Sequence, residues 1–333
     1  MFNNFINRYD FTRFILGLRH GYLPKILSRI TKGKVGRVKE AWKDEKEKNA
    51  KATTWWMIPA IGRRYNHLIT GNENIDYYHY VASKYFNGKN DLKGLSLGCG
   101  TGHRERMWAR LCDFKKIEGY DISERLIQKA REEATKKDFK EILEYQVADI
   151  LKLDFKENTY DAIFVEHSLH HFSPLEDLLI KINNCLKPDG FFVINEYVGP
   201  SRFQWTDRQL EIANGVLSIL PNKYRRHVVY GHQIKKIVRP SKLSMILKDP
   251  SEAIESGEIM PLIEKTFDVV EIRPYYGAVL HLLFDGIAGN FVEDNEETKR
   301  IFHLCLEIED LMTETGEVDS DYVLAICRKR VNK

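Results

Sequence analysis

Residues 95–103 read Leu-Ser-Leu-Gly-Cys-Gly-Thr-Gly-His, a glycine-rich turn that directly follows a short apolar run. A basic helical segment, 104–111, comes next, and a strand-like run then ends in an acid, Asp121. A helix pattern over 124–137 leads to a further strand with an acid at its end, Asp149. A glycine motif alone is weak evidence, but this one lies in an alternating strand-helix order with carboxylates after two strands. This order predicts an α/β sheet that binds a nucleotide at the glycine turn.

Three glycines shape this turn, Gly98, Gly100 and Gly102. Glycine removes side chains where a backbone passes close to a ligand and turns tightly into a helix. Nicotinamide-binding Rossmann enzymes use the spacing Gly-x-Gly-x-x-Gly, whereas here His103 follows Gly-x-Gly-x-Gly. The spacing, together with the position of Asp149, therefore argues against a dehydrogenase.

On these residues the chain resembles a class I S-adenosylmethionine-dependent methyltransferase, well over residues 92–200 and more loosely over its last strands. The resemblance implies a Rossmann-like α/β fold with a doubly wound, seven-stranded mixed sheet. It also implies an N-terminal helical extension and a helical cap inserted after the fifth strand. We expect the extension or lid at 1–90, the methyltransferase domain at 91–333 and the substrate-cap insertion at 198–266.

The resemblance implies S-adenosylmethionine as the cofactor. Asp121 would accept hydrogen bonds from the ribose hydroxyls and Asp149 from the adenine amino group, with Ile122 and Ile150 flanking the base. The expected cofactor residues are Leu97, Gly98, Cys99, Gly100, Gly102, Asp121, Ile122, Asp149, Ile150, Glu166 and His167. The resemblance also implies an Asp or Glu at position 96, where this chain has serine, so one support of the glycine turn is weaker or replaced.

In this family the acceptor pocket lies beyond the ends of the fourth and fifth strands, which places His170, His171, Glu196 and Tyr197 on the rim that carries the methyl group. A hydroxyl acceptor needs a base near neutral pH, whereas an amine loses its proton more easily. For His171, capping of the following turn is the structural alternative. The candidate catalytic residues are His171, Glu196, His170 and His232, and the candidate substrate contacts are Tyr197, Arg202, Trp205, Tyr230 and His281.

Three helix starts are predicted from capping patterns, in which a polar N-cap residue precedes a Glu or Gln by three positions. They are Ser173 with Glu176, Thr206 with Gln209, and Asp249 with Glu252. We expect the last of these helices to end at Gly257.

Composition indicates a cytoplasmic enzyme. Five cysteines without a Cys-x-x-Cys pair signal neither a metal site nor a disulfide framework, and no apolar run reaches spanning length. The first residues lack a continuous apolar core that ends in small residues, so no signal peptide is expected. The net charge of +3 is too small to imply a nucleic-acid partner. The sequence makes no prediction of oligomeric state.

Positive charge is concentrated in residues 1–39, which contain nine Lys and Arg residues and one acid, Asp10. Apolar residues from Phe11 to Tyr22 recur at helical spacing and form one face. Two interpretations stay open. The helix packs on its own catalytic domain, or it lies at the inner membrane surface and contacts anionic lipid headgroups.

The acceptor is the least determined part of the prediction. The aromatic segment 55–59 and the loop 199–205 resemble stand-alone methyltransferases of bacterial surface-glycan and small-molecule pathways. A Trp- and Arg-rich cap suits a sugar face and its phosphate or carboxylate. We expect O-methylation of a glycan or other hydroxylated metabolite, free or lipid-linked. A lipid or quinone headgroup methyltransferase and a non-catalytic cofactor-binding scaffold are the alternatives.

Overall fold

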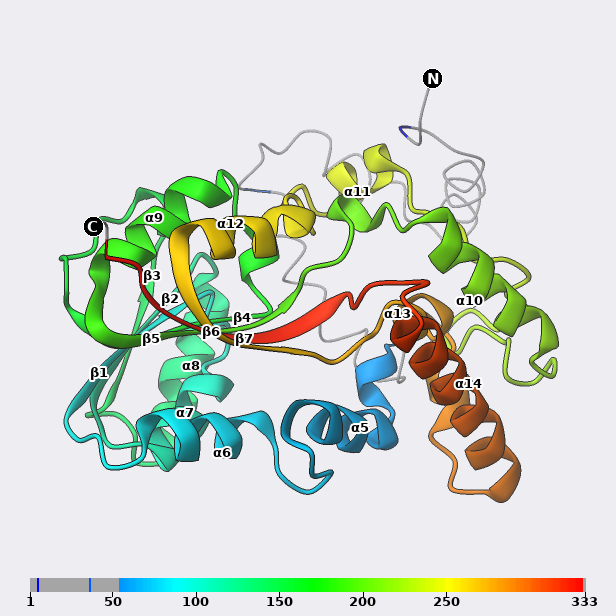
Figure 1. Cartoon of the computed structure of the whole chain (residues 1–333), viewed down its shortest axis with the longest axis horizontal. Coiled ribbons are helices and arrows are strands. Elements are labelled where there is room, and N and C mark those ends of the chain that lie inside the picture. Colours follow the sequence, from blue (N-terminus) through cyan, green and yellow to red (C-terminus); the bar gives the residue numbers. More distant parts are fainter. Residues whose placement is uncertain (1–4, 6–35, 37–53, 332–333) are drawn as a thin grey trace. The chain divides into compact units, whose positions relative to one another are not determined.

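The computed structural model describes residues 5, 36 and 54–331 of the 333-residue chain (Figure 1). The helix and the basic segment expected within residues 1–39 lie outside the described residues, apart from Phe5 and Gly36. Among the described residues, the structure contains no helix of the length and apolarity that crossing a bilayer requires.

The chain divides into two compact units. Of the described residues, the sheet unit holds 65–198, 255–275 and 323–331, and the cap unit holds 54–64, 199–254 and 276–322. The expected cap segment is therefore split between the units, and a segment from near the C-terminus joins the cap unit. The unit boundaries differ from the expected domain boundaries.

The sheet has seven strands in the order β3-β2-β1-β4-β5-β7-β6. The strands are β1 (Leu92–Leu97), β2 (Phe114–Asp121), β3 (Leu143–Val147), β4 (Tyr160–Glu166), β5 (Leu186–Tyr197), β6 (Phe267–Pro274) and β7 (Tyr322–Lys329). The β1–β2, β1–β4, β2–β3 and β4–β5 pairs are parallel, and β6 runs antiparallel to β7. The expected seven-stranded mixed sheet is confirmed.

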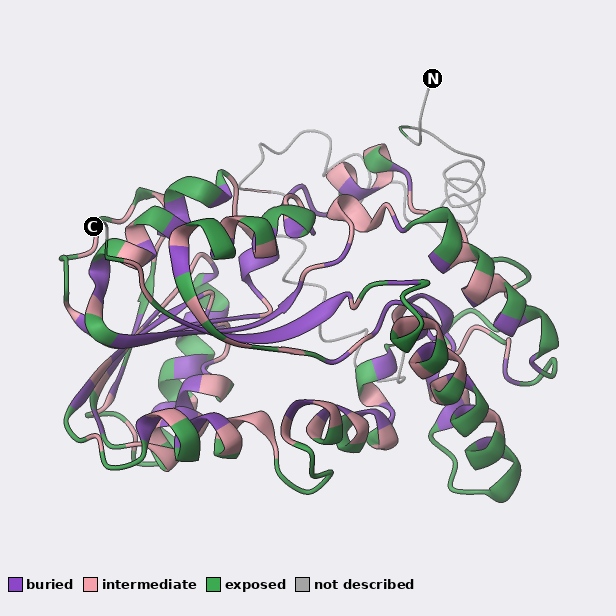
Figure 2. Cartoon of the chain, viewed as in Figure 1, coloured by how far each residue is buried: buried purple, intermediate pink, exposed green. Residues whose placement is uncertain are grey.

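Sequence pattern explains the position of each strand. β4 and β5 are buried along nearly their whole apolar runs, as central parallel strands are when helices cover both faces. After the buried Phe267, β6 alternates exposed and partly buried residues, as a half-covered edge strand does. Figure 2 shows the central strands in purple and the outer helix faces in green.

Helices of the sheet unit cover both faces of its sheet, and the cap unit has helices of its own. The α-helices are α5 (Pro59–Thr70), α6 (Tyr77–Val81), α7 (His103–Leu111), α8 (Glu124–Lys136), α9 (Leu175–Cys185), α10 (Asp207–Ile219), α11 (Lys242–Lys248), α12 (Ile259–Thr266), α13 (Leu280–Leu283) and α14 (Glu296–Glu314). Short helical turns are η2 (Trp55–Met57), η3 (Ala82–Phe86, a π-helix), η4 (Ile150–Lys152), η5 (Leu169–His171), η6 (Ser201–Phe203), η7 (Ser256–Glu258) and η8 (Ala288–Phe291).

The sheet unit has an aliphatic core on one face and an aromatic core on the other. On the aliphatic side, Leu179 of α9 and Ile263 of α12 pack with Ile163 and Ile194 of the central strands. On the other side, Trp108 of α7 stacks on Phe164 of β4, with ring centroids 4.6 Å apart. Full burial of each such side chain stabilises the fold by about 1.5–3 kcal/mol.

The capping predictions have different outcomes. The helix start predicted at Thr206 is confirmed. The Thr206 side chain accepts a hydrogen bond from the Gln209 amide, and the Gln209 side chain accepts one from the Thr206 amide. The capping pattern predicted at Ser173 is wrong, because the N-cap residue of α9 is Pro174. Glu255 supplies the cap instead: its carboxylate accepts from the Leu175 amide at 2.9 Å and from the Ser173 hydroxyl.

The helix expected to begin at Asp249 is also wrong. Asp249 is the C-cap residue of α11, and its side chain accepts hydrogen bonds from the amide (2.9 Å) and hydroxyl (2.6 Å) of Ser251. This local turn competes with helix formation for the same groups. The next α-helix begins only at Ile259.

A carboxylate on β6 anchors the segment that precedes β1. Glu271 accepts hydrogen bonds from Tyr80 (2.8 Å), Tyr85 (2.5 Å), Lys84 (3.0 Å) and Arg273 (2.8 Å). Burial alone would raise the pKa of Glu271, but the hydrogen bonds outweigh it and lower the pKa to about 2 from an ordinary value of 4.5. The cluster therefore stabilises the fold only while Glu271 is ionised.

We expect Glu271→Gln to lower the free energy of unfolding at pH 7 by about 1–2 kcal/mol, a range reduced for partial exposure of the site. Because the folded-state pKa is depressed, the contribution of Glu271 is complete above about pH 4.5 and is lost as the pH falls toward 2. Urea denaturation at pH 7 and pH 3 should show a smaller difference between wild type and variant at pH 3. Equal differences at both values would contradict this account, and the exposed Glu264→Gln is the matched control.

Candidate active site

The glycine turn leaves β1 with three positive φ angles, 76° at Gly98, 55° at Gly100 and 71° at Gly102. A Cβ on Gly98 would lie 2.5 Å from Cβ of Ser168, and one on Gly102 would collide with the Tyr145 hydroxyl. A Cβ on Gly100 would meet nothing within 4 Å. The turn is thus closely packed at its two ends and open at its middle, as a cradle for a ligand requires.

Asp121 at the end of β2 holds the turn in place. Its Oδ2 accepts from the Gly100 amide at 3.0 Å and its Oδ1 from the Ser123 amide at 2.8 Å. Each carboxylate oxygen can accept a second hydrogen bond. The half-buried Asp121 therefore combines a structural role with the capacity to bind a pair of ligand hydroxyls.

The remaining expected cofactor residues follow neighbouring strands. Ile122 comes after β2, and Asp149 and Ile150 come after β3, where Asp149 pairs with Lys152 at 3.2 Å. The carboxyl ends of parallel strands meet at one edge of a sheet, which is where open α/β sheets bind ligands. The structure thus brings the expected set together at the ends of β1, β2, β3 and β4.

Glu166 ends β4 and is almost fully buried at 4% exposure. It accepts hydrogen bonds from the Tyr77 hydroxyl at 2.7 Å and the Trp108 indole at 3.1 Å, and burial raises its pKa. The following residue, His167, has φ of 52° and stays neutral because burial lowers its pKa to about 3. Tyr77 is not among the site residues predicted from the sequence; its contact with Glu166 is seen only in the structure.

A buried carboxylate at the end of β5 orients a histidine. Glu196 is fully buried and accepts from the amides of Ser168 (2.9 Å), Leu169 (2.6 Å) and Tyr197 (2.7 Å). Its Oε1 also lies 2.5 Å from Nδ1 of His170. Burial alone would raise the pKa of Glu196, but His170 and the hydrogen bonds lower it. Glu196 is therefore ionised, and its two oxygens hold His170 and three backbone amides in position. With its pKa lowered, it is a poor proton acceptor itself.

The other candidates at this edge surround His170. The His171 ring lies 4.1 Å from the His170 ring, and the buried Tyr197 packs edge-on to it at 6.3 Å. The structure therefore gathers four expected residues, His170, His171, Glu196 and Tyr197, at the ends of β4 and β5.

Within the cap unit, two expected substrate contacts meet in an aromatic cluster. The His281 ring lies 6.0 Å from Trp205, 6.1 Å from Trp55, 5.4 Å from Phe203 and 5.7 Å from Tyr322. The Trp205 indole nitrogen is buried and has no hydrogen-bond partner among the described residues.

The remaining cap candidates have other surroundings. The Arg202 guanidinium donates to the carbonyls of Pro250 (2.7 Å) and Glu252 (3.1 Å), which ties two loops of the cap unit together. Tyr230 and His232 are exposed and pack around His227, with ring distances of 4.6 and 5.1 Å.

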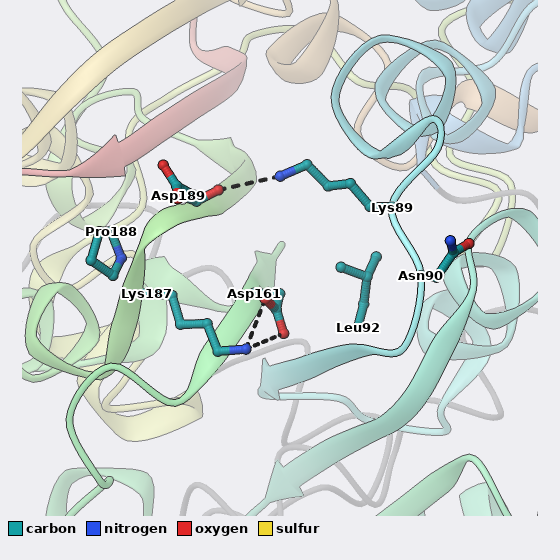
Figure 3. A pocket seen from close by; sticks show the side chains of 7 residues that line it. All are labelled: Lys89, Asn90, Leu92, Asp161, Lys187, Pro188 and Asp189. Carbon is teal, nitrogen blue, oxygen red and sulfur yellow. Dashed lines mark hydrogen bonds and ion pairs between the residues drawn. The ribbon is translucent and has the colours of Figure 1, made fainter.

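A shallow pocket lies at the opposite edge of the sheet (Figure 3). It is lined by Lys89, Asn90, Leu92, Asp161, Lys187, Pro188 and Asp189, from the amino ends of β1, β4 and β5. Lys187 pairs with Asp161 at 2.8 Å, and Lys89 donates to the Asp189 carbonyl at 3.4 Å. The pocket lies away from the carboxyl ends of the strands, where open α/β sheets bind ligands, so it is not the cofactor site.

Residues 95–194 match the family described as "Methyltransferase domain". The chain contains a class I S-adenosylmethionine-dependent methyltransferase domain. The glycine cradle, open at Gly100 and bounded by Asp121, fits S-adenosylmethionine, which is the cofactor of this domain.

Sterol and squalene methyltransferases are similar to part of this chain. The sterol 24-C-methyltransferase ERG6 of Saccharomyces cerevisiae is 32% identical over 125 residues, which cover 38% of this chain and 32% of that protein. The sterol 24-C-methyltransferase of Candida albicans is 28% identical over 157 residues, which cover 45% of this chain and 40% of that protein. Squalene methyltransferase 1 of Botryococcus braunii is 28% identical over 137 residues, which cover 40% of this chain and 36% of that protein. The chain thus spans between 32% and 40% of the length of these relatives.

Among solved structures, the [4+2]-cyclase SpnF has a TM-score of 0.45 and 15% identity, covering 76% of this chain and 81% of that one. A similarity of this size carries no functional information.

Proposed function

We propose that this protein transfers a methyl group from S-adenosylmethionine to a small apolar or lipid-like acceptor. The observation that carries the proposal is the ionised Glu196, fully buried and 2.5 Å from His170, on a strand two places from the glycine turn. A scaffold that only bound cofactor would gain nothing from an oriented histidine at the edge where acceptors bind. A buried carboxylate with a histidine partner is a common arrangement of catalytic sites.

The cofactor-binding residues have separate roles in this proposal. Gly98 and Gly100 let the backbone approach the cofactor, and Asp121 accepts hydrogen bonds from its ribose. Asp149 receives the adenine amino group, and Ile150 packs against the base. When bound, S-adenosylmethionine supplies an electrophilic methyl group on sulfur, so the chain contributes mainly positioning and proton removal.

His170 is the proposed base. Glu196 takes Nδ1, so Nε2 is directed away from the carboxylate and can accept a proton. An acceptor that gains a methyl cation must lose a proton, from oxygen for a hydroxyl and from carbon for an alkene. His171, whose ring is 4.1 Å away, lies beside this base rather than on the carboxylate.

An apolar acceptor is supported by the relatives and by the cap. The relatives are named for sterol and squalene substrates, which are apolar isoprenoid lipids. Trp55 and Trp205, at 1% and 8% exposure, are core residues of the cap unit, so the Trp-rich segment that suggested a sugar-binding face is engaged in packing. Arg202, expected from the sequence to bind a sugar phosphate, donates to backbone carbonyls instead.

O-methylation of a glycan or another hydroxylated metabolite is the second candidate. The His170–Glu196 pair favours it, because a hydroxyl needs a base of this kind.

The test uses methyl-labelled S-adenosylmethionine with separated lipid-soluble and water-soluble extracts as acceptor pools. We expect label in a lipid-soluble product and release of S-adenosylhomocysteine, with a Gly98→Val variant as the inactive blank. Label confined to water-soluble metabolites would support the second candidate. Label in protein or nucleic acid would contradict both, and cofactor binding without turnover in any pool would indicate a scaffold.

A further inference from the structure

Two adjacent charged side chains on the first turn of α7 are incompletely satisfied. Glu105 is 1% exposed; its Oε1 accepts a hydrogen bond from Ser96 at 2.5 Å. Its Oε2 is buried and has no partner among the described residues. The half-buried Arg104 makes no side-chain hydrogen bond or ion pair with any described residue. A buried charge without a partner costs several kcal/mol, so a site that retains one is built to bind a partner.

Both side chains lie beside the glycine turn. α7 begins at His103 directly after the turn, and Ser96 is the second-to-last residue of β1. Glu105 lies within electrostatic range of Cys99 in the turn. Arg104 lies within electrostatic range of Tyr77, of Glu166 at the end of β4 and of Glu105, and these interactions outweigh burial and raise the pKa of its guanidinium. The two charges thus lie next to the glycine turn, at the carboxyl end of β1.

The amino-acid end of S-adenosylmethionine carries one carboxylate and one ammonium group. A guanidinium binds a carboxylate through two parallel hydrogen bonds, and a carboxylate oxygen accepts from an ammonium. We propose that Arg104 and Glu105 form the subsite for the amino-acid end of the cofactor, Arg104 binding its carboxylate and Glu105 its ammonium group. The inference rests on the proposed cofactor site and adds to it the residues that distinguish the amino-acid end.

The serine at position 96 is consistent with this subsite. At the position where the family resemblance implies an acid, Ser96 donates a hydrogen bond to Glu105, so a carboxylate from α7 lies beside the end of β1. The acid that is absent from the strand is thus supplied by the helix.

Protonation of Glu105 gives the subsite a distinctive signature. Burial raises the pKa of Glu105 to about 7, while the Ser96 hydrogen bond and Arg104 oppose the rise. The titratable groups in range of Glu105 are Arg104, Glu166, Tyr78, Tyr145 and Cys99. The ammonium group of a ligand favours the ionised carboxylate. Binding should therefore release a proton near pH 7, and affinity should rise as the pH increases from about 6 to 7.5.

The experiment compares two ligands by calorimetry, S-adenosylhomocysteine and 5′-methylthioadenosine, which lacks the amino-acid end. We expect Glu105→Gln and Arg104→Gln each to weaken S-adenosylhomocysteine about 10- to 100-fold and to change methylthioadenosine less than about threefold. The exposed Arg110→Gln and Glu124→Gln, on α7 and α8, are the matched controls and should bind both ligands as wild type does. Adding Ser96→Asp to Glu105→Gln should restore part of the affinity.

Two further measurements separate recognition from a structural role. In buffers of different ionisation enthalpy, wild type should release a proton on binding S-adenosylhomocysteine at pH 7 and Glu105→Gln should not. The decarboxylated analogue of S-adenosylhomocysteine should bind wild type and Arg104→Gln equally. Arg104→Gln keeps the test independent of whether the buried Glu105 variant folds.

Three results would overturn the inference. S-adenosylhomocysteine binding within about threefold of wild type in both variants would remove the subsite. Equal losses for S-adenosylhomocysteine and methylthioadenosine would assign the two residues to support of the turn alone. If wild type bound methylthioadenosine and S-adenosylhomocysteine with equal affinity, the amino-acid subsite would be excluded and the cofactor site would be retained. Failure of wild type to bind either ligand would instead overturn the cofactor site itself.

Discussion

Replacing Gly98 with alanine is expected to weaken S-adenosylhomocysteine binding at least about 100-fold. The added Cβ would lie 2.5 Å from Cβ of Ser168, at a φ of 76°. Ser168 cannot move aside easily, because its hydroxyl donates to the Leu97 carbonyl at 2.7 Å and its amide to Glu196 at 2.9 Å. The turn must therefore shift, and the cradle for the cofactor is lost.

Gly88→Ala is the matched control for Gly98→Ala. Gly88 has a φ of 73°, but a Cβ at this position would meet nothing within 4 Å. The Gly88→Ala variant therefore has the backbone strain of about 1–2 kcal/mol without the collision. We expect this control to bind S-adenosylhomocysteine as wild type does. Combining Gly98→Ala with Ser168→Gly should recover part of the lost affinity. Unchanged binding by Gly98→Ala, in a variant whose melting temperature shows that it is folded, would contradict the assigned role of the turn.

Replacing Glu196 with glutamine is expected to lower turnover about 10²- to 10⁴-fold while S-adenosylhomocysteine affinity stays within about threefold. The amide NH₂ would face Nδ1 of His170 in place of Oε1, which makes Nδ1 the acceptor and leaves the proton on Nε2. His170 then cannot take a proton from the acceptor. The NH₂ would also oppose the Tyr197 amide, so stability should fall by about 1–3 kcal/mol.

The two histidine variants complete this test. His170→Gln should reduce turnover as strongly as Glu196→Gln, and His171→Gln should reduce it less. The pH profile of wild type should show turnover rising as a single group loses its proton, and this rise should disappear in His170→Gln. Wild-type turnover in Glu196→Gln would exclude the positioning role. A loss in His171→Gln equal to that in His170→Gln would assign the base to His171.

The sequence predicted the sheet well because each strand carries its own local signal. Apolar runs that end in Asp121 and Asp149 lie next to helical patterns, so the order of elements could be derived without tertiary information. The helix start at Thr206 could be predicted because both partners of the box lie within four residues. The start at Ser173 failed because its cap comes from Glu255, which is distant in the chain. Such competition between distant groups has no signature in a local pattern.

The same distinction explains the outcome at the site. The glycine turn is a contiguous motif and could be located at once. The choice between His170 and His171 could not be made from the sequence, because it depends on which ring faces Glu196 across two strands. Glu105 looked like an ordinary helix residue, and only the serine at position 96 indicated that a carboxylate was missing. The surroundings of Arg202 were likewise set by carbonyls some 50 residues away in the chain.

The central claim is that the carboxyl ends of β1 and β2 bind S-adenosylmethionine, and calorimetric titration tests it most directly. Wild-type protein should bind S-adenosylhomocysteine at one site per chain with affinity on the order of micromolar and give no heat with a nicotinamide dinucleotide. Asp121→Ala, which removes the carboxylate that holds the Gly100 amide, should abolish the binding. Heat with the nicotinamide dinucleotide and none with S-adenosylhomocysteine would contradict the account.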